Sequence, residues 1–134
     1  MALDIGVKRI GVALSDLMEI ISQPYVTIEY GRQADAFRQI GEMIEEKEVH
    51  RVIAGLPLNK EGEFTPKTKE IEKFIIKLEK YLKIDIIRVD ERWTSQDAEV
   101  LMREMGVQPS RNKADIDKFA AAIMLREYLE HGEN

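Results

Sequence analysis

The first sixteen residues place a charged side chain inside a short apolar strand, and this feature constrains the fold most strongly. Asp4 lies in a predicted strand over 2–5, and a turn at Gly6 to Lys8 leads into a second predicted strand over 9–15. Aspartate is depleted in strands, and a charge beside a core is costly unless it is paired or binds a metal. The pattern therefore predicts a hairpin whose carboxylate has a partner. A divalent cation, and with it phosphate chemistry, is the obvious candidate.

The second predicted strand has one face of small residues. Side chains alternate across a strand, so large aliphatic residues share one side of this segment and small residues share the other. The two sets are Ile10, Val12 and Leu14 on one side, and Gly11, Ala13 and Ser15 on the other. We expect the small side to let another element approach the strand closely.

The rest of the chain alternates helices and strands. We expect strands over 25–28, 49–54 and 84–89, with a turn at 55–57 after the second of them. We expect helices over 33–47, from a Thr65 cap to about 82, from 94 or 95 to a stop at Gly106, and from an Asp115 cap to about 130. The order β-β-β-α-β-α-β-α-α predicts an α/β fold with a mixed sheet covered by helices, in one domain over 1–134.

Composition excludes several classes of protein. The chain has 134 residues, a net charge of −5 and no cysteine, which rules out disulfides, thiolate metal sites and cysteine nucleophiles. Its sequence shows neither a membrane-length apolar run nor a secretory signal at its start, so we expect no membrane partner and a cytoplasmic location. The acidic balance argues against a protein that coats nucleic acid non-specifically. An enzyme with a local basic rim around an acidic centre remains compatible with it.

Three acids stand where the pattern predicts apolar, small or capping residues. Asp4 is in the first strand, Glu91 is at the end of a late strand, and Asp117 is near the start of the last helix. Carboxylates that converge repel one another unless cations hold them, and hard oxygen ligands suit Mg²⁺ or Mn²⁺. Two such ions about 3.5–4 Å apart would stabilise an in-line phosphoryl displacement. The simpler alternatives are a surface Glu91 paired with Arg92, and an Asp117 that serves the helix dipole, with Asp115 as its substitute.

Basic and amide side chains near these acids are candidate substrate contacts. The turn after Gly55 brings Asn59 into a polar loop, and either the loop faces a phosphate or it only reverses the chain. Trp93 would stack on a base or anchor the adjoining helix. His50 and His131 have no partner at ligand spacing and are interpreted as surface residues. A basic rim for phosphates, or scattered surface charge, would comprise Lys8, Arg9, Arg92, Arg111 and Lys113.

Four motifs together resemble the YqgF family of Holliday-junction-resolvase-like proteins, also described as pre-16S rRNA nucleases. They are DIGVKRIGVA at 4–13, GLPLN at 55–59, DERWTS at 90–95 and IDKFAAAIML at 116–125. The resemblance covers nearly the whole chain. It implies an RNase H-like fold, a five-stranded mixed sheet with helices on both faces. It also implies that Asp4, Glu91 and Asp117 are the metal-binding catalytic acids.

The resemblance implies a nuclease that uses Mg²⁺ or Mn²⁺ and acts in maturation of the 5′ end of 16S ribosomal RNA. With no protein nucleophile evident, activated water would attack the phosphorus. Two alternatives stay open: a resolvase of branched DNA, and a nucleic-acid-binding assembly factor without catalysis. We expect a monomer or a weak dimer. Trp93 and Lys60 depart from the family's usual residues, which affects the expected substrate contacts and not the chemistry.

Overall fold

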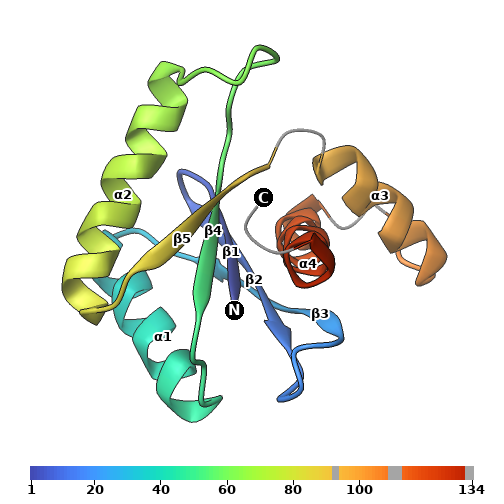
Figure 1. Ribbon diagram of the computed structural model, residues 1–134, viewed down its shortest axis with the longest axis horizontal. Helices are drawn as coiled ribbons and strands as arrows, with labels where there is room; N and C mark the ends of the chain where they lie inside the picture. The colour runs from blue at the N-terminus through green and yellow to red at the C-terminus, as the bar shows by residue number, and fades with distance from the viewer. Residues whose placement is uncertain (92–93, 109–112, 132–134) are drawn as a thin grey trace.

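The computed structural model describes residues 1–91, 94–108 and 113–131, which form a five-stranded sheet and four helices (Figure 1). The elements in chain order are β1 (Ala2–Ile5), β2 (Arg9–Ser15), β3 (Ser22–Glu29), α1 (Gln33–Glu46), β4 (Val52–Leu56), α2 (Pro66–Leu82), β5 (Ile86–Asp90), α3 (Thr94–Glu104) and α4 (Lys113–His131). None of the helices in this described part of the chain is long and apolar enough to cross a bilayer.

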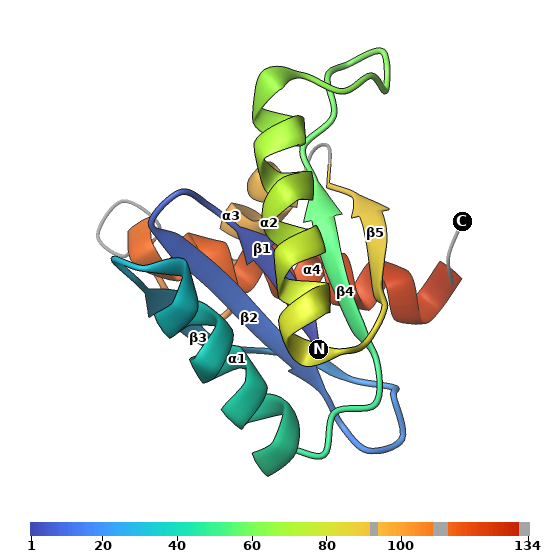
Figure 2. The ribbon, with the colours of Figure 1, turned by 90° about the vertical axis from the view of Figure 1, so that its left-hand side faces the viewer.

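The sheet is mixed and has β1 at its centre, in the order β3-β2-β1-β4-β5. β1, β2 and β3 pair antiparallel, whereas β1, β4 and β5 run parallel. α1 and α2 cover one face, α4 covers the other, and α3 packs on the outside of α4 (Figures 1 and 2). This arrangement confirms the predicted α/β class, the mixed sheet and the helices on both faces.

The two faces of the sheet are packed by side chains of different size. Under α1 and α2, large residues such as Leu3, Phe37 and Phe74 form the main core. Under α4, the strands present Ala2 and Ala13, which meet the alanines of α4 in a second core. The predicted small side of β2 is therefore the side on which α4 packs.

The start of α2 is fixed to the end of β4 by hydrogen bonds. Thr65 caps the helix as predicted, and its side chain and that of Thr68 form a reciprocal capping box. The buried Thr68 also donates from Oγ1 to the carbonyl of Pro57 at 2.6 Å. The first turn of α2 is therefore held beside the carboxyl end of β4.

Several predicted boundaries are wrong by two or three residues. β3 begins at Ser22 and contains Pro24, which an edge strand tolerates beside the register shift opposite it in β2. β4 spans Val52–Leu56 instead of 49–54, because its parallel pairing with β5 continues through the expected turn. α4 begins at Lys113, so Asp115 lies in its first turn instead of capping it, and Asp117 lies in the second turn.

Candidate active site

Three carboxylates lie near one another at the ends of β1 and β5, on the side of the sheet that α4 covers. Asp4 lies near the end of β1 and, by alternation from Ala2, points to the face that α4 covers. Glu91 directly follows β5, and its N–H donates to the carbonyl of Leu56 at the end of β4 at 3.3 Å. Asp117 comes from α4, and its charge acts on both of the other carboxylates. The structure thus brings Asp4 and Glu91 into contact and leaves Asp117 near enough for its charge to act on both, and the role of the three as metal ligands stays a prediction.

Asp4 and Glu91 form a hydrogen-bonded carboxyl pair. Burial raises the pKa of Asp4 well above its ordinary value, and the neighbouring charge and hydrogen bond of Glu91 raise it further. Burial also raises the pKa of Glu91, although the hydrogen bond with Asp4 opposes the shift. Two buried carboxylates in contact cannot both stay ionised at low cost, and the pKa of each is raised accordingly.

Asp117 is held at the edge of this pair by an arginine. Arg9 donates from Nε to Oδ2 of Asp117 at 3.1 Å, joining the start of β2 to α4. Both side chains are partly exposed, so water screens the ion pair. Arg9 was predicted as a phosphate contact, and its ion pair places it next to the carboxylates.

Two glycines make the close approach of these groups possible. Gly11 pairs with Asp4 across the β1–β2 ladder, and a Cβ added at Gly11 would overlap the backbone carbonyl of Asp117. A Cβ added at Gly55 would overlap Oε2 of Glu91 and lie 2.8 Å from the Cε of Met124. Side chains at these positions would therefore push α4 or Glu91 away from Asp4.

Lys67 is a charged neighbour of the site that the sequence reasoning missed. Its positive charge lowers the pKa of both Asp4 and Glu91, against the effect of their burial. Lys67 is an exposed residue in the first turn of α2, which the bond from Thr68 to Pro57 fixes beside the end of β4. The Thr65 cap was predicted from the sequence. No local pattern in the sequence indicates that the first turn of α2 lies beside the end of β4.

The other predicted substrate contacts differ in what their side chains do. Lys8 is exposed in the β1–β2 turn, close in sequence to the site. Asn59 is occupied within its own loop, where Oδ1 accepts from the N–H groups of Glu61 and Glu63 at 3.0 and 2.8 Å. This bonding favours the structural alternative for Asn59, an ordered chain reversal. Arg92, Trp93 and Arg111, as well as the side chain of Lys113, lie outside the described residues.

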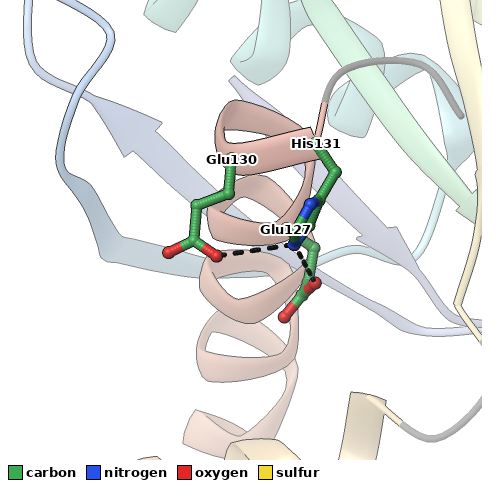
Figure 3. Close-up of side chains that lie close together, drawn as sticks. All are labelled: Glu127, Glu130 and His131. Atoms are coloured by element: carbon green, nitrogen blue, oxygen red, sulfur yellow. Dashed lines mark ion pairs between the residues drawn. The ribbon is translucent and has the colours of Figure 1, made fainter.

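A second group of possible metal-binding side chains lies on the last turns of α4, separate from the predicted acids (Figure 3). His131 Nε2 lies 3.6 Å from a carboxylate oxygen of Glu127 and 3.7 Å from one of Glu130. All three side chains are exposed. An i,i+4 pair of Glu127 with His131 and the adjacent Glu130 account for this group on the helix surface, in agreement with the interpretation of His131 as a surface residue.

The donor types at Asp4, Glu91 and Asp117 suit a hard divalent cation, although among the described residues it is the exposed group on the last turns of α4 whose ligand atoms all lie within 4.8 Å of one another. The three groups offer carboxylate oxygens, the ligand type that Mg²⁺ and Mn²⁺ prefer. Asp4 and Glu91 are largely withdrawn from water and repel each other when ionised, so a cation between them would offset this repulsion. Asp117 would complete the set from the side of α4.

Comparison with known proteins places the chain among nucleases over its whole length. A family model for RuvX, described as Holliday junction resolvase, matches residues 1–131. A relative from Chloroflexus aggregans, named as a proposed pre-16S rRNA nuclease, is 40% identical over 134 residues, which are 100% of this chain and 94% of the relative. A relative of the same name from Thermoanaerobacter pseudethanolicus is 38% identical over 135 residues, covering 100% of this chain and 97% of its own.

Solved structures show the same fold at low sequence identity. Thermus thermophilus RuvC in complex with a Holliday junction substrate matches with a TM-score of 0.61 at 11% identity, over 98% of this chain and 94% of RuvC. A second Thermus thermophilus RuvC structure matches with a TM-score of 0.60 at 12% identity, over 98% of this chain and 95% of RuvC. The fold is therefore RNase H-like, as the sequence motifs implied. Since the family model and the relatives both cover nearly the full chain, this protein belongs to the RuvX family, the YqgF family that its motifs resemble.

Proposed function

We propose that this chain is a divalent-metal-dependent nuclease that hydrolyses phosphodiester bonds in the precursor of 16S ribosomal RNA, in the cytoplasm. The observation that carries the proposal is the hydrogen-bonded pair of Asp4 and Glu91 with Asp117 beside it. Burial and mutual repulsion of these carboxylates lower stability, and a bound cation would offset this cost. The choice of substrate rests on the names of the relatives, which are described as proposed pre-16S rRNA nucleases.

In this proposal, Asp4, Glu91 and Asp117 hold Mg²⁺ or Mn²⁺. The ion would act as a Lewis acid toward the scissile phosphate and the attacking water. Ionised carboxylates are the ligands of a cation, and the pKa values of Asp4 and Glu91 are both raised, so activity should rise with pH as this pair ionises.

The cations around the carboxylates would position the nucleic acid. Arg9 keeps Asp117 in place through their ion pair and lies close enough to meet a flanking phosphate. Lys67 approaches the carboxylates from α2, and Lys8 lies in the exposed β1–β2 turn. These three residues place positive charge beside the carboxylates of a protein whose net charge is −5, which suits a phosphate backbone bound locally.

Branched DNA is the second candidate substrate. The family description and the fold of a RuvC that was solved with a Holliday junction favour it. We place RNA first because relatives at 38–40% identity carry the rRNA name, whereas the RuvC likeness at 11% reflects the fold.

A cleavage assay in Mg²⁺ tests the proposal, with precursor rRNA and a four-way DNA junction offered side by side. Wild type should cut the rRNA, and Asp4→Asn should reduce the rate by at least about 100-fold, in the range seen when an electrostatic group of an active site is lost. Asp85→Asn makes the same chemical change at an exposed position before β5 and should leave the rate unchanged. Equal cleavage by Asp4→Asn and wild type would refute the site. Preferential junction cutting would support branched DNA, and metal binding without cleavage would indicate an assembly factor.

A further inference from the structure

The connection between β2 and β3, residues 16–21, exposes a run of large apolar side chains, and we call it the apolar loop. Leu17, Met18, Ile20 and Ile21 expose 83%, 75%, 67% and 56% of their surface. Single exposed hydrophobic residues are ordinary on a protein surface, but four in five consecutive positions form a continuous patch. Such a patch is typical of an interaction surface.

The apolar loop is ordered by its own hydrogen bonds. Oδ1 of Asp16 accepts from the N–H groups of Ile20 and Ile21 at 2.7 and 3.0 Å, and these bonds lower the pKa of Asp16. The N–H of Asp16 donates in turn to the carbonyl of Ile21 at 3.1 Å. Because the backbone of the loop is already fixed, its apolar side chains can be buried against a partner with little further loss of entropy.

A groove lies directly beside the loop, over the start of β1, and we call it the N-terminal groove. Its volume is about 210 Å³. A cavity of about 150 Å³ holds a benzene ring, so this groove has room for at least one large aliphatic side chain. Apolar residues from four parts of the chain line it: Met1, Leu14, Val49, Ile53, Leu125 and Leu129.

The two walls of the groove carry opposite charges. The wall formed by the apolar loop contributes Asp16 and Glu19. The wall formed by the segment between α1 and β4 contributes Lys47, His50 and Arg51. One face of the molecule therefore combines a protruding apolar loop, an apolar groove, an acidic side and a basic side.

We propose that this face binds a second copy of the chain, with the apolar loop of each copy inserted into the N-terminal groove of the other. A two-fold interface requires a self-complementary surface, and here both the protrusion and the hollow lie on one face. The same arrangement sets the acidic loop wall of one copy against the basic wall of the second copy. An apolar patch with acidic residues on its loop does not suit a phosphate backbone.

This inference goes beyond the proposed function and does not depend on it. The apolar loop lies at the opposite end of the sheet from the β1–β2 turn and the end of β4, where the carboxylates meet (Figures 1 and 2). A dimer formed through the apolar loop therefore leaves both carboxylate sites open to a nucleic acid.

Sedimentation velocity of the whole chain, from about 1 to about 500 μM, tests the proposal. Wild type should convert from monomer to dimer within this range. Met18→Asp combined with Ile20→Asp should raise the dissociation constant at least roughly tenfold, because it places charge in the apolar contact. Val100→Asp changes an exposed apolar residue of α3 in the same way and should leave the constant unchanged. A wild type that stays monomeric throughout, or a dimer that the loop variant leaves intact, would overturn the proposal.

Exchanging the charges of Glu19 and Lys47 tests whether the partner that fills the N-terminal groove is a second copy of the chain. Glu19→Lys and Lys47→Glu should each weaken the dimer by roughly threefold to tenfold, through repulsion between the facing walls. The double variant restores opposite charges across the interface and should return the constant close to that of wild type. A double variant at least as weak as the single variants would show that these walls do not face each other. Circular dichroism checks that each variant is folded.

Discussion

The two faces of the sheet differ in what their side chains do. Under α1 and α2, large residues such as Leu3 and Phe74 fill a continuous core. Under α4, β1 and β2 present small residues such as Ala2, Gly11 and Ala13. Asp4 lies on the same face and is charged. Because Gly11 has no side chain, the backbone of α4 packs directly against β2 at this point. Gly11 pairs with Asp4 in the sheet, so the carbonyl of Asp117 lies close to the β1–β2 ladder at Asp4. The face under α1 and α2 stabilises the fold, whereas the face under α4 buries less apolar surface near Asp4 and holds the carboxylates.

The largest change in stability should come from the face under α1 and α2. Phe74 is buried, and its ring makes an edge contact with Phe37 at a centroid distance of 5.2 Å. Phe74→Ala should lower the free energy of unfolding by about 3–5 kcal/mol, measured in urea. Cleavage per folded molecule should stay at the wild-type level.

Phe64→Ala is the matched control, because this ring is exposed in the loop before α2. It should change stability by no more than about 0.5 kcal/mol. If Phe74→Ala abolished cleavage while the protein remained folded, the division of roles between the faces would be wrong.

Gly11→Ala should disturb the packing of α4 on the sheet. Compared with Phe74→Ala, it should cost less stability and more activity. Its Cβ overlaps the backbone of Asp117, so α4 must move, at about 1–3 kcal/mol. Cleavage should fall by at least roughly tenfold, since small displacements of an active-site group reduce rates strongly. Gly31→Ala, where a Cβ meets nothing within 4 Å, should leave stability and rate unchanged. Equal behaviour of the two variants would contradict the role given to Gly11.

Lys67→Met tests the contribution of α2 to the candidate site. The loss of one charge-assisted contact to phosphate, worth about 1.4 kcal/mol, should reduce kcat/KM about tenfold. Lys69→Met removes the same charge from an exposed position two residues along the helix and should have little effect. Comparable losses in the two variants would show a general effect of charge instead of a contact by Lys67.

The pH dependence of stability should separate wild type from Asp4→Asn in EDTA. The pKa of Asp4 is raised in the folded state, so the folded protein binds more protons than the unfolded chain between the two pKa values. The stability from this proton is complete below the unfolded value of about 3.9 and is lost as the pH rises through the folded value. Wild type should therefore lose stability relative to Asp4→Asn as the pH increases from about 4. A constant difference across this range would contradict the raised pKa.

Much of this fold could be predicted from local patterns. Alternation in β2 identified the side on which α4 packs, and Thr65 with Pro66 located the start of α2. The errors arose where tertiary pairing overrides local signals. Gly55 and Leu56 continue β4 because β5 pairs with them, although their sequence resembles a turn.

The candidate site was predicted as residue types and not as contacts. Asp4 was marked by its place in an apolar strand, Glu91 by its place at a strand end and Asp117 by its place near a helix start. The motif resemblance then implied a shared role for the three. The ion pair of Arg9 with Asp117 joins residues 108 positions apart, and no local pattern reports such a pairing. For Asn59 the hydrogen bonds within its own loop favour the structural alternative, and its contact with substrate stays a prediction.

Thermal unfolding of wild type and Asp4→Asn at pH 7, first in EDTA and then in Mg²⁺, tests the central claim most directly. If the carboxylate pair exists to hold a cation, Asp4→Asn should unfold roughly 3–5 °C above wild type in EDTA, a gain of ~1 kcal/mol from relieved repulsion. Mg²⁺ should then raise the unfolding temperature of wild type and leave that of the variant unchanged. A variant less stable than wild type in EDTA, or an equal response of both proteins to Mg²⁺, would contradict the account.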